Sequence, residues 1–186
     1  MDQKEKWNRK HAQRLSGKEE LMPNPLLKKL VKNKGEGLAI DIACGLGANS
    51  LFLAEQGYEV TSLDLSEVAI RFVRKEAERR SLRIQAKAID LEELAPISEE
   101  GKKYNLAIMT NYLDRSLFPV IKELLNTGGC FFMETFFMTE ERSSQTIPDK
   151  YKLRSNELLE VFQEWKILFF EKNVQSGKQA IFCEKK

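Results

Sequence analysis

The chain contains few of the residues that build metal sites and disulfide frameworks. Its 186 residues include three cysteines and one histidine. Cys44, Cys130 and Cys183 are odd in number and far apart, so the sequence shows neither a disulfide framework nor a CxxC metal motif. Because His11 is the only histidine, a zinc site is not expected. The sequence therefore predicts no metal site.

Long apolar runs and a strong charge of one sign are also missing. No apolar stretch approaches the ~18 residues that span a bilayer, and the opening MDQKEKWNRKH is polar, unlike a secretory signal. We therefore expect a cytoplasmic protein that makes no membrane contact. The net charge of +2 is too small to indicate a polyanionic partner, so the charge gives no support to nucleic-acid binding.

The overall composition is that of one soluble globular domain. Hydrophobic residues make up 42% of the chain and charged residues 31%. A chain of this length buries roughly 70% of the surface that it exposes when unfolded, so one core is sufficient. We expect a single domain over residues 1–186, with an N-terminal helical segment at 1–34 and a core at 37–186. The two prolines of MPNP interrupt the helical segment.

Strand and helix signals alternate along the core, which is typical of an α/β protein with a mainly parallel sheet. Strands are expected at residues 38–42, 58–63, 83–88, 105–109, 130–135, 165–171 and 179–184. Helices are expected at residues 49–56, 67–80, 115–125 and 155–163. Gly128 and Gly129 are expected to stop the third helix, and NVQSGK to join the last two strands as a hairpin. Residues 92–103 are expected to form a loop with one helical turn.

The segment LAIDIACGLGANS, residues 38–50, joins the first strand to the first core helix. Its first five residues are apolar except for Asp41, which is typical of a strand buried on both faces of a parallel sheet. Gly45 and Gly47 then form a tight turn that leaves no side chain between the backbone and a bound ligand. The sequence therefore predicts a ligand site at this turn.

Polar residues also follow the other predicted strands, and ligands of open parallel sheets bind outside the carboxyl ends of the strands. Asp64 closes the second strand about 20 residues after the first glycine, where an acidic side chain accepts hydrogen bonds from ribose hydroxyls. Ser50 stands where the dinucleotide fingerprint has its third glycine, and no P-loop lysine follows the glycines. These residues predict a nucleoside-bearing ligand without identifying it.

The stretch AIDIACGLGANSLFLAEQGYEVTSLDLS resembles motif I and the following acidic loop of class I S-adenosylmethionine-dependent methyltransferases, with Cys44 at a small-residue position. AIDLEEL and MTNYLDRSLFPVIKELLNTGGCFFMETF are similar to later segments of that family. YKLRSNELLEVFQEWKILFFEK resembles the C-terminal part of its small bacterial members of the tellurite-resistance type. The resemblance covers most of the chain from Gly37 onward. It implies a doubly wound, Rossmann-like sheet of seven mostly parallel strands, with an antiparallel C-terminal hairpin and helices on both faces.

The resemblance also implies a cofactor, S-adenosylmethionine, and its product, S-adenosylhomocysteine. The residues implied to bind the cofactor are Asp41, Ala43, Cys44, Gly45 and Gly47 at its methionine end, Asp64 at the ribose hydroxyls, Leu65, Asp90 and Leu91 at the adenine, and Thr110 and Asn111 beside the reactive methyl group. Backbone donors suit the carboxylate of this ligand, and acidic side chains suit its amine and hydroxyls.

The candidate catalytic residues are His11, Asn111 and Tyr112. His11 is either a general base or a surface residue of a polar helix, and many family members carry an aromatic hydroxyl at its position. Cys44 has no identifiable base, so packing beside the ligand is favoured over nucleophilic chemistry. The arginines considered for gripping an anionic acceptor are Arg14, Arg115 and Arg154.

The implied reaction is an in-line transfer of methyl to a small acceptor such as a thiol, a chalcogen oxyanion or another small metabolite. Such an acceptor needs no strong base. Two alternatives stay open, an RNA methyltransferase and a non-catalytic module that binds the cofactor. A cluster formed by Lys28, Lys29, Lys32 and Lys34 is the basic patch that RNA would use. The sequence is compatible with either a monomer or a homodimer.

Overall fold

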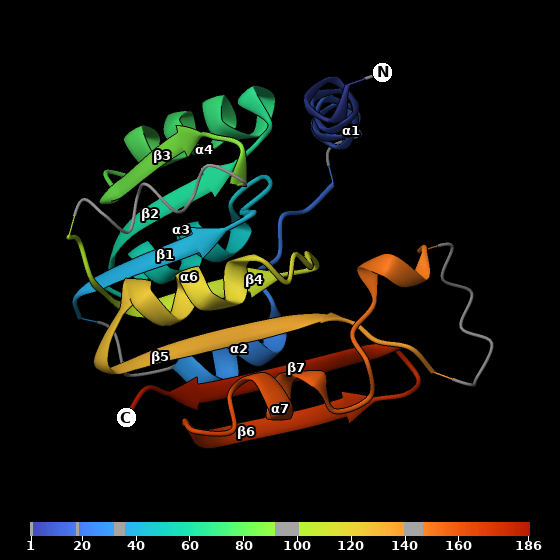
Figure 1. Ribbon diagram of the computed structural model, residues 1–186. Coiled ribbons are helices and arrows are strands. Elements are labelled where there is room, and N and C mark those ends of the chain that lie inside the picture. Colours follow the sequence, from blue (N-terminus) through green and yellow to red (C-terminus); the bar gives the residue numbers. More distant parts are fainter. Residues whose placement is uncertain (1, 18, 32–35, 92–100, 140–146) are drawn as a thin grey trace.

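The computed structural model describes residues 2–17, 19–31, 36–91, 101–139 and 147–186, and its centre is a seven-stranded sheet (Figure 1). The strand order is β3-β2-β1-β4-β5-β7-β6. Strand β7 runs antiparallel to both of its neighbours, and the other adjacent strands are parallel. The strands are β1 (Leu38–Ile42), β2 (Glu59–Asp64), β3 (Ile84–Ala88), β4 (Tyr104–Thr110), β5 (Leu125–Phe136), β6 (Lys166–Asn173) and β7 (Lys178–Glu184). The predicted doubly wound sheet with its C-terminal hairpin is confirmed.

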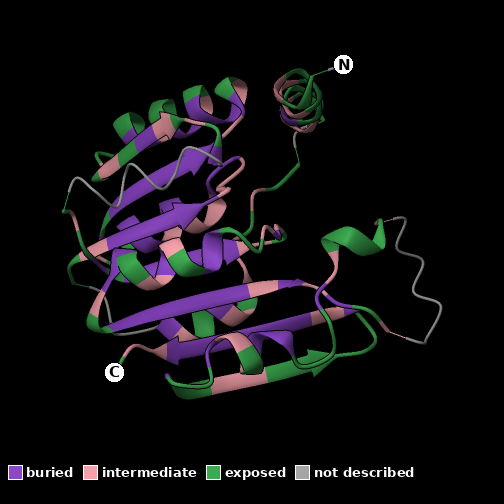
Figure 2. Ribbon diagram, viewed as in Figure 1, coloured by how far each residue is buried: buried purple, intermediate pink, exposed green. Residues whose placement is uncertain are grey.

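Helices cover both faces of this sheet because its central strands are apolar on both sides. One core cluster contains Ile40, Ala107 and Phe131 and is covered by α6 and α7. The other contains the alternate strand residues Ala39 and Leu106 and is covered by α2 and α3. Figure 2 shows the resulting band of buried strands. The helices are α1 (Gln3–Ser16), α2 (Pro25–Val31), α3 (Ala48–Glu55), α4 (Glu67–Arg79), α6 (Leu117–Leu124) and α7 (Glu157–Val161), with a 3-10 turn η2 (Asp149–Tyr151).

Helix α6 ends within one residue of its predicted end, but the predicted role of the two glycines and the predicted start of the fifth strand are wrong. Helix α6 ends at Leu124, and β5 begins at Leu125, so Gly128 and Gly129 lie inside a strand instead of stopping a helix. A Cβ on Gly129 would lie 3.0 Å from the Tyr104 carbonyl oxygen, where the pairing of β4 and β5 changes register. The glycine therefore permits close backbone approach at a bulge. Helix α7 is also shorter than predicted.

The N-terminal segment forms one helix on each side of MPNP, as its prolines predict. Helix α2 packs Leu27 and Val31 into the core. Helix α1 is largely exposed, and Figure 1 shows it near the N-terminal end of α4. Most of the loop predicted at 92–103 lies outside the described residues. None of the helices that the structure describes is long and apolar enough to cross a bilayer.

Candidate functional site

The turn between β1 and α3 is held in a conformation that most residues avoid. Ala43, Gly45 and Gly47 have φ angles of 59°, 54° and 74°. The Cys44 N–H donates to the Leu63 carbonyl oxygen at 2.9 Å, which ties the turn to β2. A Cβ on Gly47 would lie 2.5 Å from Val73 Cγ2, so only glycine fits. The turn therefore presents backbone, not side chains, at the carboxyl edge of the sheet.

Asp64, at the end of β2, fixes this turn from the other side. Its Oδ2 accepts the Gly45 N–H and its Oδ1 accepts the Ser66 N–H, each at 2.8 Å. The side chain is buried, and each carboxylate oxygen has a second lone pair. Asp64 therefore orders the turn while keeping acceptor capacity for ligand hydroxyls.

Asp41, in β1, is a fully buried carboxylate whose hydrogen bonding is incomplete. Its Oδ2 accepts the Ser50 hydroxyl at 2.6 Å, and Ser50 in turn accepts the Ser62 hydroxyl at 2.8 Å. No described residue donates to Oδ1. Burial raises the pKa of Asp41 to about 7; the Ser50 hydrogen bond opposes the shift, and the charge of Asp64 adds to it. A buried acceptor without a donor is where a ligand's cationic donor would be stabilised.

Helix α1 docks beside the turn and buries His11 there. The His11 side chain is 4% exposed, and a Cβ on Gly45 would lie 3.3 Å from its Cε1. The Trp7 ring stacks on the imidazole, with centroids 5.8 Å apart. Asn8 Oδ1 accepts hydrogen bonds from the Ser66 hydroxyl, at 2.8 Å, and from a backbone N–H of α4. Of the two alternatives for His11, the surface residue is wrong, because the side chain is buried at the turn; its role as a general base stays a prediction.

Burial lowers the pKa of His11, and the positive charges of Arg14 and Lys10 lower it further, whereas the charge of Asp64 opposes the shift. The imidazole is therefore neutral at pH 7. Its Nδ1 has no partner among the described residues.

The turn after β4 is also strained. Asn111 is exposed and has a φ of 55°, and its N–H donates to the Glu134 carbonyl oxygen at 2.8 Å. The preceding Thr110 hydroxyl accepts from Asn49 Nδ2 at 3.0 Å. Tyr112, the next residue, is half-buried. The strand end is therefore held in one conformation from two sides.

Sequence reasoning missed the residue that connects these groups, Asn24. Its N–H donates to Asn49 Oδ1 and its Nδ2 to Glu134 Oε1, both at 2.8 Å. These partners are distant in sequence, and Asn24 itself reads as an ordinary turn residue of MPNP. It links the N-terminal segment to the turn after β4.

The predicted adenine-binding residues lie at the same edge. The Ile89 N–H donates to the Asp64 carbonyl oxygen at 3.0 Å, which brings the end of β3 beside Asp64. Asp90 is exposed, Leu91 is buried and Leu65 is half-buried. The structure thus gathers the predicted cofactor residues at the carboxyl ends of β1 to β4.

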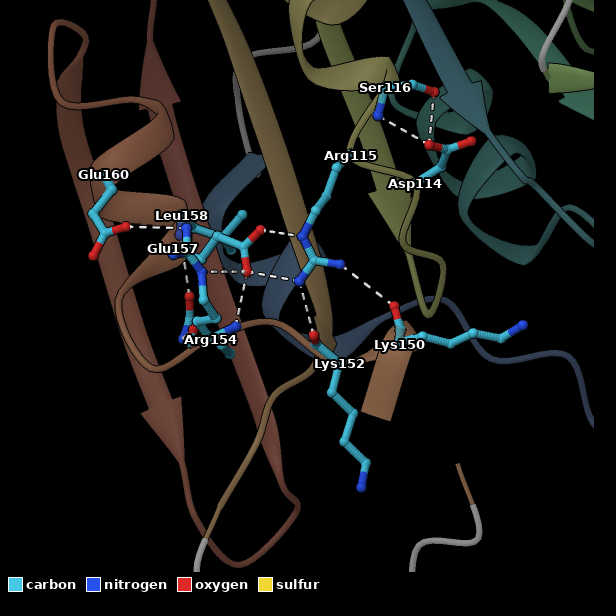
Figure 3. A network of polar contacts seen from close by, with 10 residues as sticks. Asp114, Arg115, Ser116, Lys150, Lys152, Arg154, Glu157, Leu158 and Glu160 are labelled. Carbon is cyan, nitrogen blue, oxygen red and sulfur yellow. Dashed lines mark hydrogen bonds and ion pairs between the residues drawn. The ribbon is translucent and has the colours of Figure 1, made fainter. Parts of the chain in front are cut away.

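The arginines predicted to grip an anion have other partners. Arg115 forms a two-pronged ion pair with Glu157 and also donates to the Lys150 and Lys152 carbonyl oxygens (Figure 3). Arg14 pairs with Glu19 at 2.8 Å, and Arg154 pairs with Glu157 and Glu160. The structure does not support an anion-binding role for these side chains; Arg115 instead joins the segment after β4 to η2 and α7.

Comparison with known proteins places this geometry in a family. The model of a family described as tellurite resistance protein TehB matches residues 25–180. The chain belongs to the TehB family. A probable S-adenosyl-L-methionine-dependent methyltransferase, TehB of Haemophilus influenzae, is 30% identical over 139 residues, which cover 73% of this chain and 48% of that protein. The chain spans about half the length of the curated relatives it matches.

Solved structures show the same fold. The crystal structure of TehB from Haemophilus influenzae superposes with a TM-score of 0.76 at 24% identity, covering 88% of this chain and 62% of that one. An S-adenosylmethionine-dependent methyltransferase from Mesorhizobium loti gives a TM-score of 0.69 at 18% identity, covering 87% and 96%. The resemblance of the sequence to methyltransferases of the tellurite-resistance type is confirmed.

Proposed function

We propose that this TehB-family chain is an S-adenosylmethionine-dependent methyltransferase that acts on a small acceptor. The observation that carries the proposal is the carboxyl edge of the sheet, where Asp64 and the buried, incompletely bonded Asp41 flank a turn of exposed backbone. The names of the family relatives support the same cofactor.

The chemistry of this donor set fits the parts of the cofactor. Oδ1 of Asp41 would accept from the ammonium group, and Asp64 would accept from the ribose hydroxyls. Backbone N–H groups near Gly45 and Gly47 would face the carboxylate. Asp90 would accept from the exocyclic amine of the adenine, which Leu65 and Leu91 would contact through their side chains.

The sulfonium of the bound cofactor supplies an electrophilic methyl group and a neutral leaving group, so no acid is needed. The chain's task is to orient the acceptor in line and to exclude water. Thr110, Asn111 and Tyr112 would position the reacting groups at the end of β4. Neutral His11 would accept a proton from a protonated acceptor, and α1 would shield the site from solvent.

The acceptor that fits best is a small nucleophile such as a thiol or a chalcogen oxyanion. Such acceptors are already anionic or weakly acidic, which suits a site with one neutral imidazole as its base. RNA is the competing acceptor. Lys28 and Lys29 of the predicted basic patch are exposed on α2, whereas Lys32 and Lys34 lie outside the described residues.

Calorimetric titration with S-adenosylmethionine, followed by measurement of S-adenosylhomocysteine release, tests the proposal. We expect micromolar cofactor binding and turnover with at least one of a set of small thiols, selenite and tellurite. Asp149→Ala, which removes an exposed carboxylate of η2, is the control and should behave as wild type. Binding without turnover on any acceptor, RNA included, would favour a non-catalytic module, and turnover on RNA alone would replace the small acceptor.

A further inference from the structure

A chain of buried hydroxyls ends on Asp41 beneath the glycine turn. Ser62 of β2, Ser50 of α3 and Asp41 of β1 are each 0% exposed. Ser62 lies opposite Asp41 in the pairing of β1 with β2, but its hydroxyl reaches the carboxylate only through Ser50. Three elements thus contribute polar side chains to one buried line. Burying polar groups is costly unless they are hydrogen-bonded; the two hydroxyls and Oδ2 of Asp41 are, whereas Oδ1 is not.

The hydrogen bonds from Ser62 to Ser50 and on to Asp41 all run in one direction, because each hydroxyl has only one proton to donate. Ser62 donates to Ser50, and Ser50 donates to Oδ2 of Asp41. The 2.6 Å separation of Ser50 Oγ and Asp41 Oδ2 is short, and this hydrogen bond strengthens when Asp41 becomes charged. The Ser50 hydroxyl therefore donates to Oδ2 of Asp41, whereas Oδ1 has no donor among the described residues.

We propose that Ser50 and Ser62 are positioning residues that orient Asp41 toward the ammonium group of S-adenosylmethionine, and that cofactor binding displaces a proton from Asp41. This inference rests on the proposed cofactor. In the step, the O–H bond of the neutral carboxyl breaks and the proton passes to the solvent. The carboxylate then accepts a hydrogen bond from the ammonium group, so no oxidant or second reactant is required.

The charge state of the free protein supports this step. Burial raises the pKa of Asp41 to about 7, so the free protein holds this proton in the neutral pH range far more than an exposed aspartate does. Among the described residues, two titratable groups face Asp41. The charge of Asp64 in β2 raises the pKa of Asp41, and desolvation raises the pKa of the half-buried Cys44 thiol, which stays neutral. Across Gly45, His11 of α1 faces Asp64 and is neutral at pH 7. An ammonium group would supply the positive charge that ionised Asp41 lacks.

The experiment is calorimetric titration of the full chain with S-adenosylmethionine between pH 5.5 and 7.5. This range stays below about 8, where α-amino groups lose their proton. Titrations in two buffers with different heats of ionisation count the protons released. We expect the affinity to fall up to about tenfold for each pH unit below the pKa of Asp41, with proton release on cofactor binding near neutral pH.

Four variants separate positioning from a structural role. Asp41→Asn should bind weakly, independently of pH, and without proton release. Ser50→Ala should move the pH midpoint upward by about one unit, because a charge-assisted hydrogen bond is lost, whereas Ser50→Thr keeps the hydroxyl and the midpoint. Thr61→Val is the matched control, since it removes a buried hydroxyl of β2 that bonds to Tyr104 instead of Ser50. Its midpoint should be that of wild type.

The outcomes distinguish the two proposals. Cofactor binding at pH 7.5 that is equally strong at pH 5.5, without proton release, overturns this inference and leaves the proposed function intact. Equal loss of affinity at every pH in Ser50→Ala shows a merely structural serine and also overturns it. A His11→Gln variant that loses the pH dependence would assign the proton to the imidazole instead. Absence of binding at every pH removes both proposals.

Discussion

Replacing Arg115 by methionine should destabilise the fold through the carboxylate that it leaves behind. The guanidinium Nη2 lies 2.8 Å from Glu157 Oε2 and 3.0 Å from the Lys152 carbonyl oxygen (Figure 3). The Glu157 side chain is 3% exposed, and in the variant its close remaining donor is the Arg154 N–H at 2.8 Å. Breaking a buried pair costs about 3–5 kcal/mol, and because the Arg115 side chain is 44% exposed we expect about 3 kcal/mol.

For a chain of this length, about 3 kcal/mol lowers the melting temperature by about 6–12 °C. Urea unfolding followed by circular dichroism measures the change directly. The double variant Arg115→Met/Glu157→Met removes both charges and should recover at least about 1.5 kcal/mol relative to the sum of the single changes. A loss below about 0.5 kcal/mol in Arg115→Met, or additive single changes, would refute the reasoning.

Three further predictions concern stability without cofactor. Because burial raises the folded-state pKa of Asp41 from 3.8 to about 7, the stability of wild type relative to Asp41→Asn should fall by about 4 kcal/mol as the pH rises from 4 to 8. Urea titrations of both proteins at both pH values would show this. Burial raises the pKa of Glu157, but the hydrogen bonds and charge of Arg115 hold it below its ordinary value. The stability that this pair contributes should therefore be lost as the pH falls below 4.5. The free energy of unfolding of Glu157→Gln should not show this loss. Gly47→Ala should lower the free energy of unfolding by about 2–4 kcal/mol, since its φ is positive and its Cβ would contact Val73. Gly128→Ala, with a φ of 78° and open space around it, should lower it by about 1–2 kcal/mol. Similar losses in the two variants would contradict the steric explanation.

The succession of strands along the chain and the position of the glycine turn could be predicted because both depend on local patterns. A run such as Leu38–Ile42 is buried on both faces in any parallel sheet, and Gly45 and Gly47 mark the turn by themselves. The start of β5 could not be predicted, because Leu125 pairs with Tyr104, which lies twenty-one residues earlier in the sequence. Gly128 was therefore misread as a helix stop.

The side-chain partners at the site were the least predictable feature. Asp64 could be found from its distance along the chain to the first glycine, because the strand end places it. The partners of Asn24, Asn49 and Arg115 lie far away in the sequence, and only the folded chain brings them together. The burial of His11 likewise results from the docking of α1 on α4, which no local pattern shows.

The most direct test of the central claim compares S-adenosylmethionine binding to wild type and to Asp64→Ala by calorimetry at pH 7.5, with circular dichroism confirming that both are folded. The account predicts micromolar binding to wild type and a loss of about 100-fold in the variant, since two hydrogen bonds to a charged group contribute about 3 kcal/mol. Equal affinity in the two proteins, or binding of NADH in place of S-adenosylmethionine, would contradict the account.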